Sequence, residues 1–320
     1  MENRRSILKK GALAALALAV PATTSCEYMS KIKASVPLKT RQVKIALVAW
    51  YSQTGNTARA GRLLTATLQA HGVKVDAGNL KSIDLSNIPN YDLLVIGSPV
   101  FYYDSPAYVQ DWIRSLPDLA GAAVAAYVTF GGPEGNQHNA ACSILERLTE
   151  KRGVPVAQTA FMNLGTYPLS WAGGKVKEAT WNARHLPDQE TFARVREYAG
   201  YILAKVDRGD NPAFAKRLTM REILTYMGPI YWTKKSIEQH YLDKNKCIQC
   251  GACVDQCPAN AIDLSDYAVD RQACVLCFGC LNNCPAQAVY MQYDGEPLIG
   301  YRDFLKLYNL TVSEPPELQT

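Results

Sequence analysis

The chain has 320 residues, of which 48% are hydrophobic and 20% are charged, with a formal net charge of +5. The length leaves room for more than one domain, and the composition is that of an ordinary soluble protein. Part of the positive charge lies in the first ten residues and no basic stripe stands out elsewhere, so the sequence gives no basis for nucleic-acid binding.

Residues 1–26 have the order of an export signal peptide. Basic residues precede the apolar run 11–20, which is followed by small residues. This run of about ten residues is too short for a bilayer, which needs roughly twenty. Residues 3–9 (NRRSILK) resemble a twin-arginine signal, with a general secretory signal as the alternative. We expect export to the periplasm or another extracytoplasmic face of the membrane, with residues 27–41 as a spacer.

Cys26 is a candidate for lipid modification, because it follows the small residues Thr23, Thr24 and Ser25. A lipid on this cysteine would attach the protein to a membrane. The residue three positions before Cys26 is Thr instead of Leu, so a signal that is cleaved without lipidation stays open as the alternative.

From residue 42 the sequence alternates between apolar strands and helical segments. Residues 43–51 form a nearly continuous apolar run, as a strand buried on both faces requires. A helix that stops at Gly72 follows. Further strands are expected near 73–77, 92–97, 122–130 and 155–161, with helices near 106–116 and 138–152. This alternation predicts an α/β domain with a doubly wound, parallel, five-stranded sheet.

The turn SQTGNT (52–57) joins the first strand to the first helix. Amides at a helix N-terminus favour an anion, the hydroxyl groups add donors, and Gly55 lets the backbone approach closely. No GK[ST] motif is present, so a nucleotide's terminal phosphates and Mg²⁺ would lack their usual partners. The turn therefore predicts a site for one phosphomonoester, with a hydroxyl-rich helix cap as the alternative.

Two other loops would lie at the same edge of the sheet if the strand order is 2-1-3-4-5. GSPVFYYDSP (97–106) follows the third strand and TFGGPEGN (129–136) follows the fourth. Strands one and three would then open a ligand crevice at their C-terminal ends. The aromatic residues 101–103 are suited to cover a flat ring, and the glycines at 131 and 132 would let backbone amides approach its edge.

These motifs resemble those of flavodoxins over roughly residues 42–206, and the resemblance implies FMN as the cofactor. It implies that the phosphate is held by Ser52, Thr54, Gly55, Asn56 and Thr57. The residues that would surround the isoalloxazine ring are Ser98, Pro99, Val100, Phe101, Tyr102, Tyr103, Thr129, Phe130, Gly131 and Gly132.

A second signal is the repeated motif C-x2-C-x2-C-x3-C-P. It occurs at 247–258 (CIQCGACVDQCP) and again, 27 residues later, at 274–285 (CVLCFGCLNNCP). Three close cysteines followed by one beside a proline suit a cubane cluster. Zinc, the minor alternative, usually takes two ligand pairs separated by a longer loop. Disulfides, the other alternative, gain nothing from this spacing.

The repeat resembles bacterial two-cluster ferredoxins over residues 243–293, which implies a small α+β domain with two [4Fe–4S] clusters. In that family the fourth cysteine of each motif binds the other cluster. Carried over to this chain, one cluster is held by Cys247, Cys250, Cys253 and Cys284. The other is held by Cys257, Cys274, Cys277 and Cys280.

The remaining segments carry weaker signals. Residues 207–242 are expected to form a helical connector, and residues 294–320 a surface tail or cap. Cys142 is expected to be a buried structural thiol, and the four histidines form no recognisable ligand set.

The whole chain resembles a fusion of a flavodoxin-like domain with a two-cluster ferredoxin. This implies an extracytoplasmic iron–sulfur flavoprotein that transfers electrons between the clusters, FMN and a redox partner protein. The twin-arginine pathway exports folded proteins, so cofactors inserted in the cytoplasm would be carried out with the chain. An FMN-dependent reductase of a small acceptor, such as a quinone or an aromatic compound, is the alternative. Clusters that serve only as structural staples would leave the flavin loops unexplained.

Overall fold

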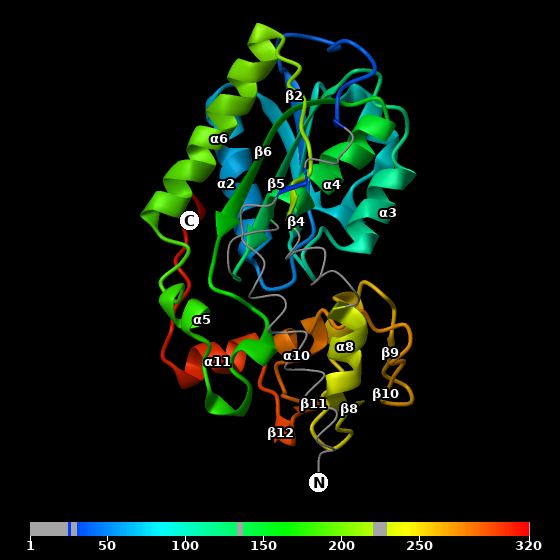
Figure 1. The fold of residues 1–320 in the computed structure, drawn as a ribbon, viewed down its shortest axis with the longest axis vertical. Coiled ribbons are helices and arrows are strands. Elements are labelled where there is room, and N and C mark those ends of the chain that lie inside the picture. Colours follow the sequence, from blue (N-terminus) through cyan, green and yellow to red (C-terminus); the bar gives the residue numbers. More distant parts are fainter. Residues whose placement is uncertain (1–24, 27–30, 133–136, 220–228, 320) are drawn as a thin grey trace.

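A computed structural model describes residues 25–26, 31–132, 137–219 and 229–319 of the chain (Figure 1). The predicted twin-arginine motif at 3–9 lies outside these residues. Cys26 belongs to β1 (Ser25–Cys26), which pairs antiparallel with β7 (Leu218–Thr219). Within the described ranges, no helix has both the length and the apolar character needed to cross a membrane.

The first domain is built on a five-stranded parallel sheet, as the sequence predicted. Its strands, in spatial order, are β3 (Lys74–Asn79), β2 (Ile45–Trp50), β4 (Leu93–Pro99), β5 (Ala123–Phe130) and β6 (Val154–Met162). This is the order 2-1-3-4-5, so the strands that are first and third in sequence are neighbours. Their C-terminal ends form the edge at which we expected a ligand.

Helices cover both faces of this sheet (Figure 1). One face packs against α2 (Asn56–Ala70) and α6 (Gln189–Arg208), and the other against α3 (Ala107–Ser115) and α4 (Gln137–Glu150). The sequence predicted all of these except α6, whose N-cap Asp188 accepts a hydrogen bond from the Thr191 amide. A short helix, α5 (Glu178–Asn182), precedes it.

Tyr127 on β5 fixes the start of α2 from inside the core. Its side chain is fully buried, and its hydroxyl donates a hydrogen bond to the carbonyl of Thr57 (3.1 Å). The ring fills space left by two glycines: an added Cβ would lie 2.5 Å from the Tyr127 oxygen at Gly61 and 2.1 Å from its ring at Gly97. These glycines therefore give one ring room to hold the first turn of α2.

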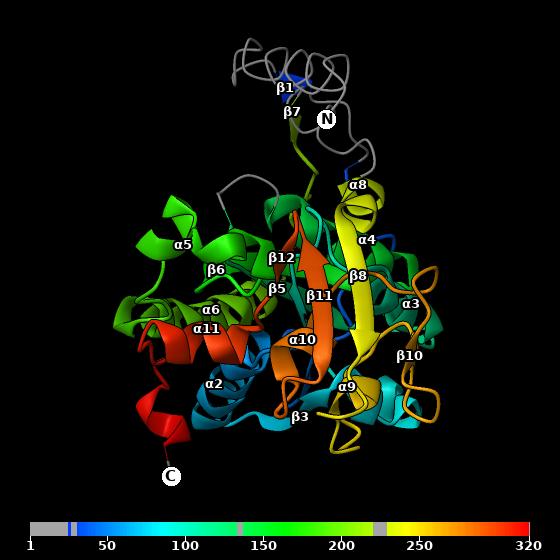
Figure 2. The same ribbon diagram turned by 90° about the horizontal axis from the view of Figure 1, so that it is seen from below.

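The second domain is a small cysteine-rich α+β unit. It has a three-stranded antiparallel sheet of β8 (Ile237–Leu242), β11 (Val289–Tyr293) and β12 (Glu296–Pro297), and a hairpin of β9 (Ile262–Asp263) and β10 (Ala268–Val269). Two short helices, α9 (Ala252–Asp255) and α10 (Gly279–Asn283), contain the third cysteines of the two motifs, Cys253 and Cys280 (Figure 2).

The expected helical connector over 207–242 is wrong in two places. Residues 210–217 are not helical and are followed by strand β7, and the C-terminal end of the connector forms another strand. Helix α8 spans Pro229–Ser236, but the next six residues form β8 instead of continuing the helix. Ile237, His240 and Leu242 are buried, and pairing with β11 supplies backbone hydrogen bonds along the strand. Long-range pairing thus overrides the local helical pattern.

The C-terminal residues, expected as a surface tail or cap, run back along the first domain (Figure 1). Helix α11 (Tyr301–Leu307) places Phe304 in a stack with Trp171, with ring centroids 4.2 Å apart. Beyond it, Glu314 forms an ion pair with Arg59 of α2 (2.7 Å). A second ion pair joins Arg196 of α6 to Glu317 (2.7 Å). We call residues 308–319 the C-terminal strap.

The packing around Tyr127 makes a testable prediction. Gly61→Ala should lower the free energy of unfolding by about 1–3 kcal/mol, because the new methyl group overpacks the core. The measurement is urea denaturation followed by circular dichroism.

Gly200 on α6 is the matched control, since no atom lies within 4 Å of its ideal Cβ position. Gly200→Ala should be neutral or raise the free energy of unfolding by about 0.5–1 kcal/mol, as expected for a helical glycine. Equal destabilisation by both changes would contradict the described packing.

Candidate functional site

Three loops meet at the C-terminal edge of the parallel sheet. Residues 52–57 follow β2, residues 97–106 begin at the end of β4, and residues 129–132 begin at the end of β5. The amide of Val100 donates to the carbonyl of Thr129 (3.0 Å). The hydroxyls of Thr57 and Thr129 are 2.7 Å apart. Hydrogen bonds therefore bring together the three loops that the sequence singled out.

The turn 52–57 has the features of a phosphate site. Gly55 adopts a left-handed conformation (φ 95°), and the helix that follows it has no side-chain cap and no acidic residue in its first turn. Among the described residues, Ser52 Oγ and Gln53 Nε2 are buried without a hydrogen-bond partner. An uncapped helix N-terminus beside two orphaned polar atoms fits an anionic group of a ligand.

Asn56 and Thr57 use their side chains to hold the turn. The Asn56 amide group donates to the carbonyl of Leu164 (3.4 Å), and its oxygen accepts from the Arg59 guanidinium (2.9 Å). Arg59 in turn pairs with Glu314 of the C-terminal strap. The phosphate turn is thus fixed by contacts that include the far end of the chain.

The aromatic loop contains a strained turn. Phe101 and Asp104 exchange two backbone hydrogen bonds, and the two residues between them, Tyr102 and Tyr103, have positive φ angles of 48° and 73°. A positive φ raises the conformational free energy of a bulky residue, and such residues are concentrated at functional sites. The Tyr102 hydroxyl donates to the carbonyl of Leu276 (2.9 Å), whereas Tyr103 is 41% exposed. Tyr102, expected to cover a ring, therefore contacts the cysteine-rich domain.

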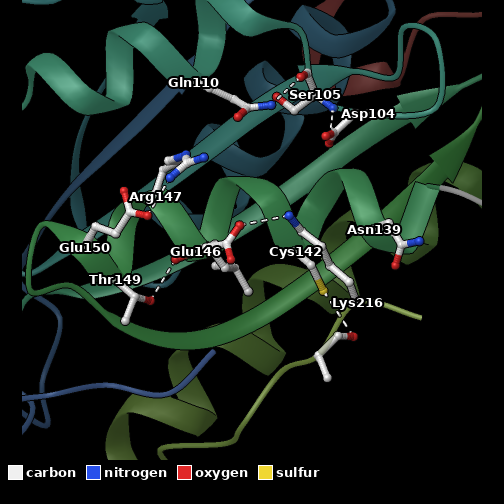
Figure 3. Close-up of polar contacts among 12 residues, drawn as sticks. Asp104, Ser105, Gln110, Asn139, Cys142, Glu146, Arg147, Thr149, Glu150 and Lys216 are labelled. Atoms are coloured by element: carbon white, nitrogen blue, oxygen red, sulfur yellow. Dashed lines mark hydrogen bonds and ion pairs between the residues drawn. The ribbon is translucent and has the colours of Figure 1, made fainter. Parts of the chain in front are cut away.

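The other end of this loop is held by a buried polar network (Figure 3). The hydroxyl of Ser98 lies 3.2 Å from that of Ser105, whose amide donates to Asp104 (2.7 Å). The Gln110 amide group donates to the Ser105 carbonyl (2.7 Å). Burial raises the pKa of Asp104. The hydroxyl of Ser98 is thus engaged with its own loop, while Pro99 ends β4.

The third loop has two glycines with different surroundings, preceded by Phe130 at the end of β5. A Cβ at Gly131 would lie 2.2 Å from the Cα of Gly165, so Gly131 permits two backbones to touch. Among the residues that the structure describes, none has an atom within 4 Å of an ideal Cβ at Gly132. Of the two, only Gly132 leaves its surroundings open to a ligand.

The cysteines of the two motifs fall into two groups. In what we call the second group, burial raises the pKa of Cys280 well above its ordinary value, and charge on Cys277, Cys274 and Cys257 raises it further. Burial likewise raises the pKa of Cys277 to about 12, with further contributions from Cys274 and Cys257. Cys257 of the first motif therefore lies beside three cysteines of the second.

The first group contains the remaining four cysteines. A cavity is lined by Cys247, Cys250, Cys253 and Cys284 together with apolar residues of the same domain. Burial raises the pKa of Cys253, and charge on Cys284 and Cys247 raises it further. Cys284 of the second motif therefore lies beside three cysteines of the first.

Both motifs direct backbone amides at their sulfurs. In the first motif, the amides of Gln249 and Ala261 donate to the sulfurs of Cys247 (3.4 Å) and Cys257 (3.3 Å). The equivalent bonds of the second motif run from Leu276 to Cys274 (3.4 Å) and from Ala288 to Cys284 (3.2 Å). Hydrogen bonds to sulfur are one means by which proteins tune iron–sulfur clusters.

The donor set fits an iron–sulfur site in its chemistry. All eight motif cysteines are free thiols, and cysteine thiolates are the ligands of [4Fe–4S] clusters. Over the described part of the chain, no three His, Cys, Asp or Glu side chains converge as the ligands of one metal ion would.

The second motif lies directly on the phosphate turn. Asn282 donates to the side-chain oxygen of Gln53 (3.2 Å), and Asn283 donates to the backbone carbonyl of Gln53 (3.1 Å). A Cβ at Gly279 would lie 2.8 Å from the Gln53 side chain. The Tyr51 hydroxyl donates to the carbonyl of Gln256 (3.2 Å). Of these residues, none was among the predicted site residues.

Cys142 lies elsewhere, on α4 (Figure 3). Its sulfur is 3.4 Å from Gln158 Oε1, and the Gln158 amide donates to His138 Nδ1 (3.0 Å). His138 Nε2 lies 2.9 Å from the carbonyl oxygen of Ala215 and 3.5 Å from the Cys142 sulfur. Burial raises the pKa of Cys142 to about 11. The expectation that Cys142 is buried is confirmed.

Two family models match separate parts of the chain. The model described as "Flavodoxin" matches residues 48–192, and the model described as "4Fe-4S binding domain" matches residues 240–263. No curated protein sequence matches. The chain therefore combines a flavodoxin domain with a 4Fe–4S ferredoxin-type domain.

Solved flavodoxins are similar to this chain over about half its length. A flavodoxin from the domain Archaea is 17% identical, with a TM-score of 0.37, over 51% of this chain and 98% of its own. The Streptococcus pneumoniae TIGR4 flavodoxin is 14% identical, with a TM-score of 0.39, over 50% and 99%. Flavodoxin 2 of Bacillus cereus is 21% identical, with a TM-score of 0.38, over 51% and 99%.

The crossed grouping of the cysteines can be tested with double variants. Cys257→Ala combined with Cys274→Ala removes two ligands of one group, so about four irons per chain should remain, as in either single variant. Cys257→Ala combined with Cys247→Ala affects both groups and should leave almost no iron. The measurement is iron and acid-labile sulfide per chain after anaerobic purification.

Circular dichroism serves as the control for folding in each variant. If each motif binds its own cluster, the iron contents will be reversed. The variant with Cys257→Ala and Cys247→Ala will then keep half of its iron, and the variant with Cys257→Ala and Cys274→Ala will lose all of it.

Proposed function

We propose that this chain is an extracytoplasmic electron-transfer protein, in which FMN and two [4Fe–4S] clusters exchange electrons with one another and with a redox partner protein. The observation that carries the proposal is the contact between the second cysteine motif and the phosphate turn. Asn283, three residues after Cys280, donates to the backbone of Gln53 at 3.1 Å.

Each cofactor has a set of residues to hold it. The FMN phosphate would be held by the turn 52–57, where Ser52 Oγ and Gln53 Nε2 lack partners among the described residues. The clusters would be held by the first and second groups of cysteines. When bound, FMN supplies a centre that exchanges one or two electrons, and each cluster supplies one that exchanges single electrons.

The residues of the chain hold the two cofactor sites in fixed positions relative to each other. Gln53 positions the phosphate turn against α10, and Tyr102 connects the aromatic loop to the second motif through the Leu276 carbonyl. Backbone amides on the cysteine sulfurs stabilise negative charge there. Short, fixed separations between redox centres are what such a protein must supply.

The three loops 52–57, 97–106 and 129–132 form the edge of the sheet where FMN would bind, which we call the flavin edge. Contacts at this edge favour an electron carrier over a reductase of small molecules. A reductase needs an opening over the flavin ring for its acceptor. Here Tyr51 and Gln53, which follow β2, and Tyr102, which lies in the aromatic loop after β4, all hydrogen-bond to the ferredoxin-type domain. A second redox domain over the site supports electron exchange inside the chain.

The extracytoplasmic location is supported by residues 1–26. Their basic, apolar and small-residue segments follow the order of an export signal, and Arg4 and Arg5 are adjacent. A pathway for folded proteins suits a chain whose cofactors are inserted before export. Attachment through a lipid on Cys26 is part of the same proposal.

Cofactor content in the exported protein tests the proposed function. Protein recovered anaerobically from outside the cytoplasm should contain about eight irons, about eight acid-labile sulfides and about one FMN per chain. The control replaces Arg4 and Arg5 together with lysine, which keeps the charge. This variant should stay in the cytoplasm with the same cofactor content.

Two results would contradict the proposal in different ways. Full iron without flavin would leave a ferredoxin and remove the FMN half of the function. Zinc, or oxidised cysteines without iron, would remove electron transfer altogether.

A further inference from the structure

The two cysteine motifs are copies with different surroundings, which makes one an internal control for the other. In the first motif, Cys250 is exposed and Ile248 is 65% exposed. Their equivalents 27 residues later, Cys277 and Val275, are half-buried. Because spacing and backbone are shared, the difference comes from what covers each motif.

The second motif is covered both by the core of its own domain and by residues of the flavodoxin domain such as Tyr102. Leu276 and Phe278 occupy the positions of Gln249 and Gly251 in the first motif, and they are 4% and 2% exposed. Leu276 accepts the hydrogen bond from Tyr102 at 2.9 Å. Two apolar side chains thus replace a polar one and a glycine where the motif meets the other domain.

Phe278 also has a strained backbone conformation where the second motif meets the flavodoxin domain. Its φ angle is 60°, in the left-handed region where Gly251 has 77°. A bulky residue is disfavoured there, whereas glycine is not. The Phe278 ring packs edge-on against Tyr167, with centroids 5.3 Å apart. Phe278 therefore contacts Tyr167 of the flavodoxin domain while its backbone is in a conformation that is unfavourable for a bulky residue.

The two cysteine groups also differ in their neighbours. Burial raises the pKa of Tyr51 and of Tyr108, and charge on Cys277 raises each further. Both tyrosines belong to the flavodoxin domain. The cavity of the first group is lined only by residues between 242 and 289. The second group thus adjoins the edge of the sheet where FMN would bind, whereas the cavity of the first group is lined by residues of the ferredoxin-type domain.

We propose that the cofactors act in a fixed order: the first group holds the cluster that exchanges electrons with the exterior, and the second group holds the cluster that exchanges electrons with FMN. This order rests on the proposed function. When bound, the cluster held by the first group would exchange single electrons with a one-electron donor or acceptor outside the protein, and the cluster held by the second group would exchange them with FMN.

The test removes one cluster at a time. Cys250→Ala disrupts the first group and Cys274→Ala the second. Reduced methyl viologen, generated by a light pulse in substoichiometric amount, is the donor, and absorbance follows the clusters and FMN separately. In Cys274→Ala, the rate at which the clusters reduce FMN should fall at least about tenfold, because the remaining cluster is misplaced relative to FMN. In Cys250→Ala, the rate of electron uptake from methyl viologen should fall more than the rate of electron transfer from the remaining cluster to FMN.

FMN affinity gives a second readout that needs no electron transfer. Asn283→Ala leaves all eight ligands in place but removes a hydrogen bond to Gln53, so the Kd for FMN should rise about three- to tenfold. Gln256, the equivalent position in the first motif, is the matched control, because its contact with Tyr51 uses the backbone carbonyl. Gln256→Ala should leave the Kd for FMN unchanged, and iron content should stay constant in both variants.

The outcomes separate this inference from the proposed function. Internal transfer that survives Cys274→Ala but not Cys250→Ala would reverse the order, and equal effects of the two variants would refute it. Either result would leave electron transfer within the chain intact. If clusters and FMN in the unaltered protein exchange no electrons, the proposed function fails. An unchanged Kd for FMN in Asn283→Ala would refute the docking of the second motif on the phosphate turn, from which the position of the second group beside FMN is argued.

Discussion

Gln53 is held between the two domains at both its side chain and its backbone. Asn282 and Asn283 of α10 donate to it, and the turn on which it lies has the partnerless polar atoms and left-handed glycine of an anion site. This one residue links the phosphate turn to a helix that carries a cysteine ligand. The relation between the flavin edge and the clusters depends on it.

Such a contact does not need to be strong. Neutral hydrogen bonds contribute only about 0.5–1.5 kcal/mol each, and two of them would not hold separate proteins together. The domains here belong to one chain, which keeps each at an effective concentration on the order of millimolar near the other. The C-terminal strap adds ion pairs from Glu314 and Glu317 to the flavodoxin domain. Because the two domains are covalently linked, a few weak polar contacts are enough to hold them in one arrangement.

Much of each domain was predictable from local sequence. The apolar run 43–51 and the strand–helix alternation predicted the parallel sheet, because buried parallel strands need continuous apolar residues. The strand order 2-1-3-4-5 was a condition of the predicted ligand crevice, and the structure confirms it. The cysteine spacing indicated the ligands, and the family resemblance gave their crossed grouping. The helix expected through residue 242 failed because the last six residues pair with a strand nearly fifty residues later.

The docking of the domains was not predictable in the same way. Gln53 and Asn283 are 230 residues apart, and neither type of side chain signals a partner at that distance. The aromatic residue Tyr102 fitted a ring-covering role in the sequence but contacts Leu276 in the structure. One local signal did exist. Leu276 and Phe278, in place of Gln249 and Gly251, mark the second motif as the buried copy.

The central claim is that electrons pass between the clusters and FMN inside a single chain. The most direct measurement is the rate of FMN reduction after a light pulse reduces the clusters, followed over a wide range of protein concentrations. The account predicts a first-order rate that does not change with protein concentration, because the domains are already docked. A rate that rises in proportion to protein concentration would show transfer between molecules and contradict it.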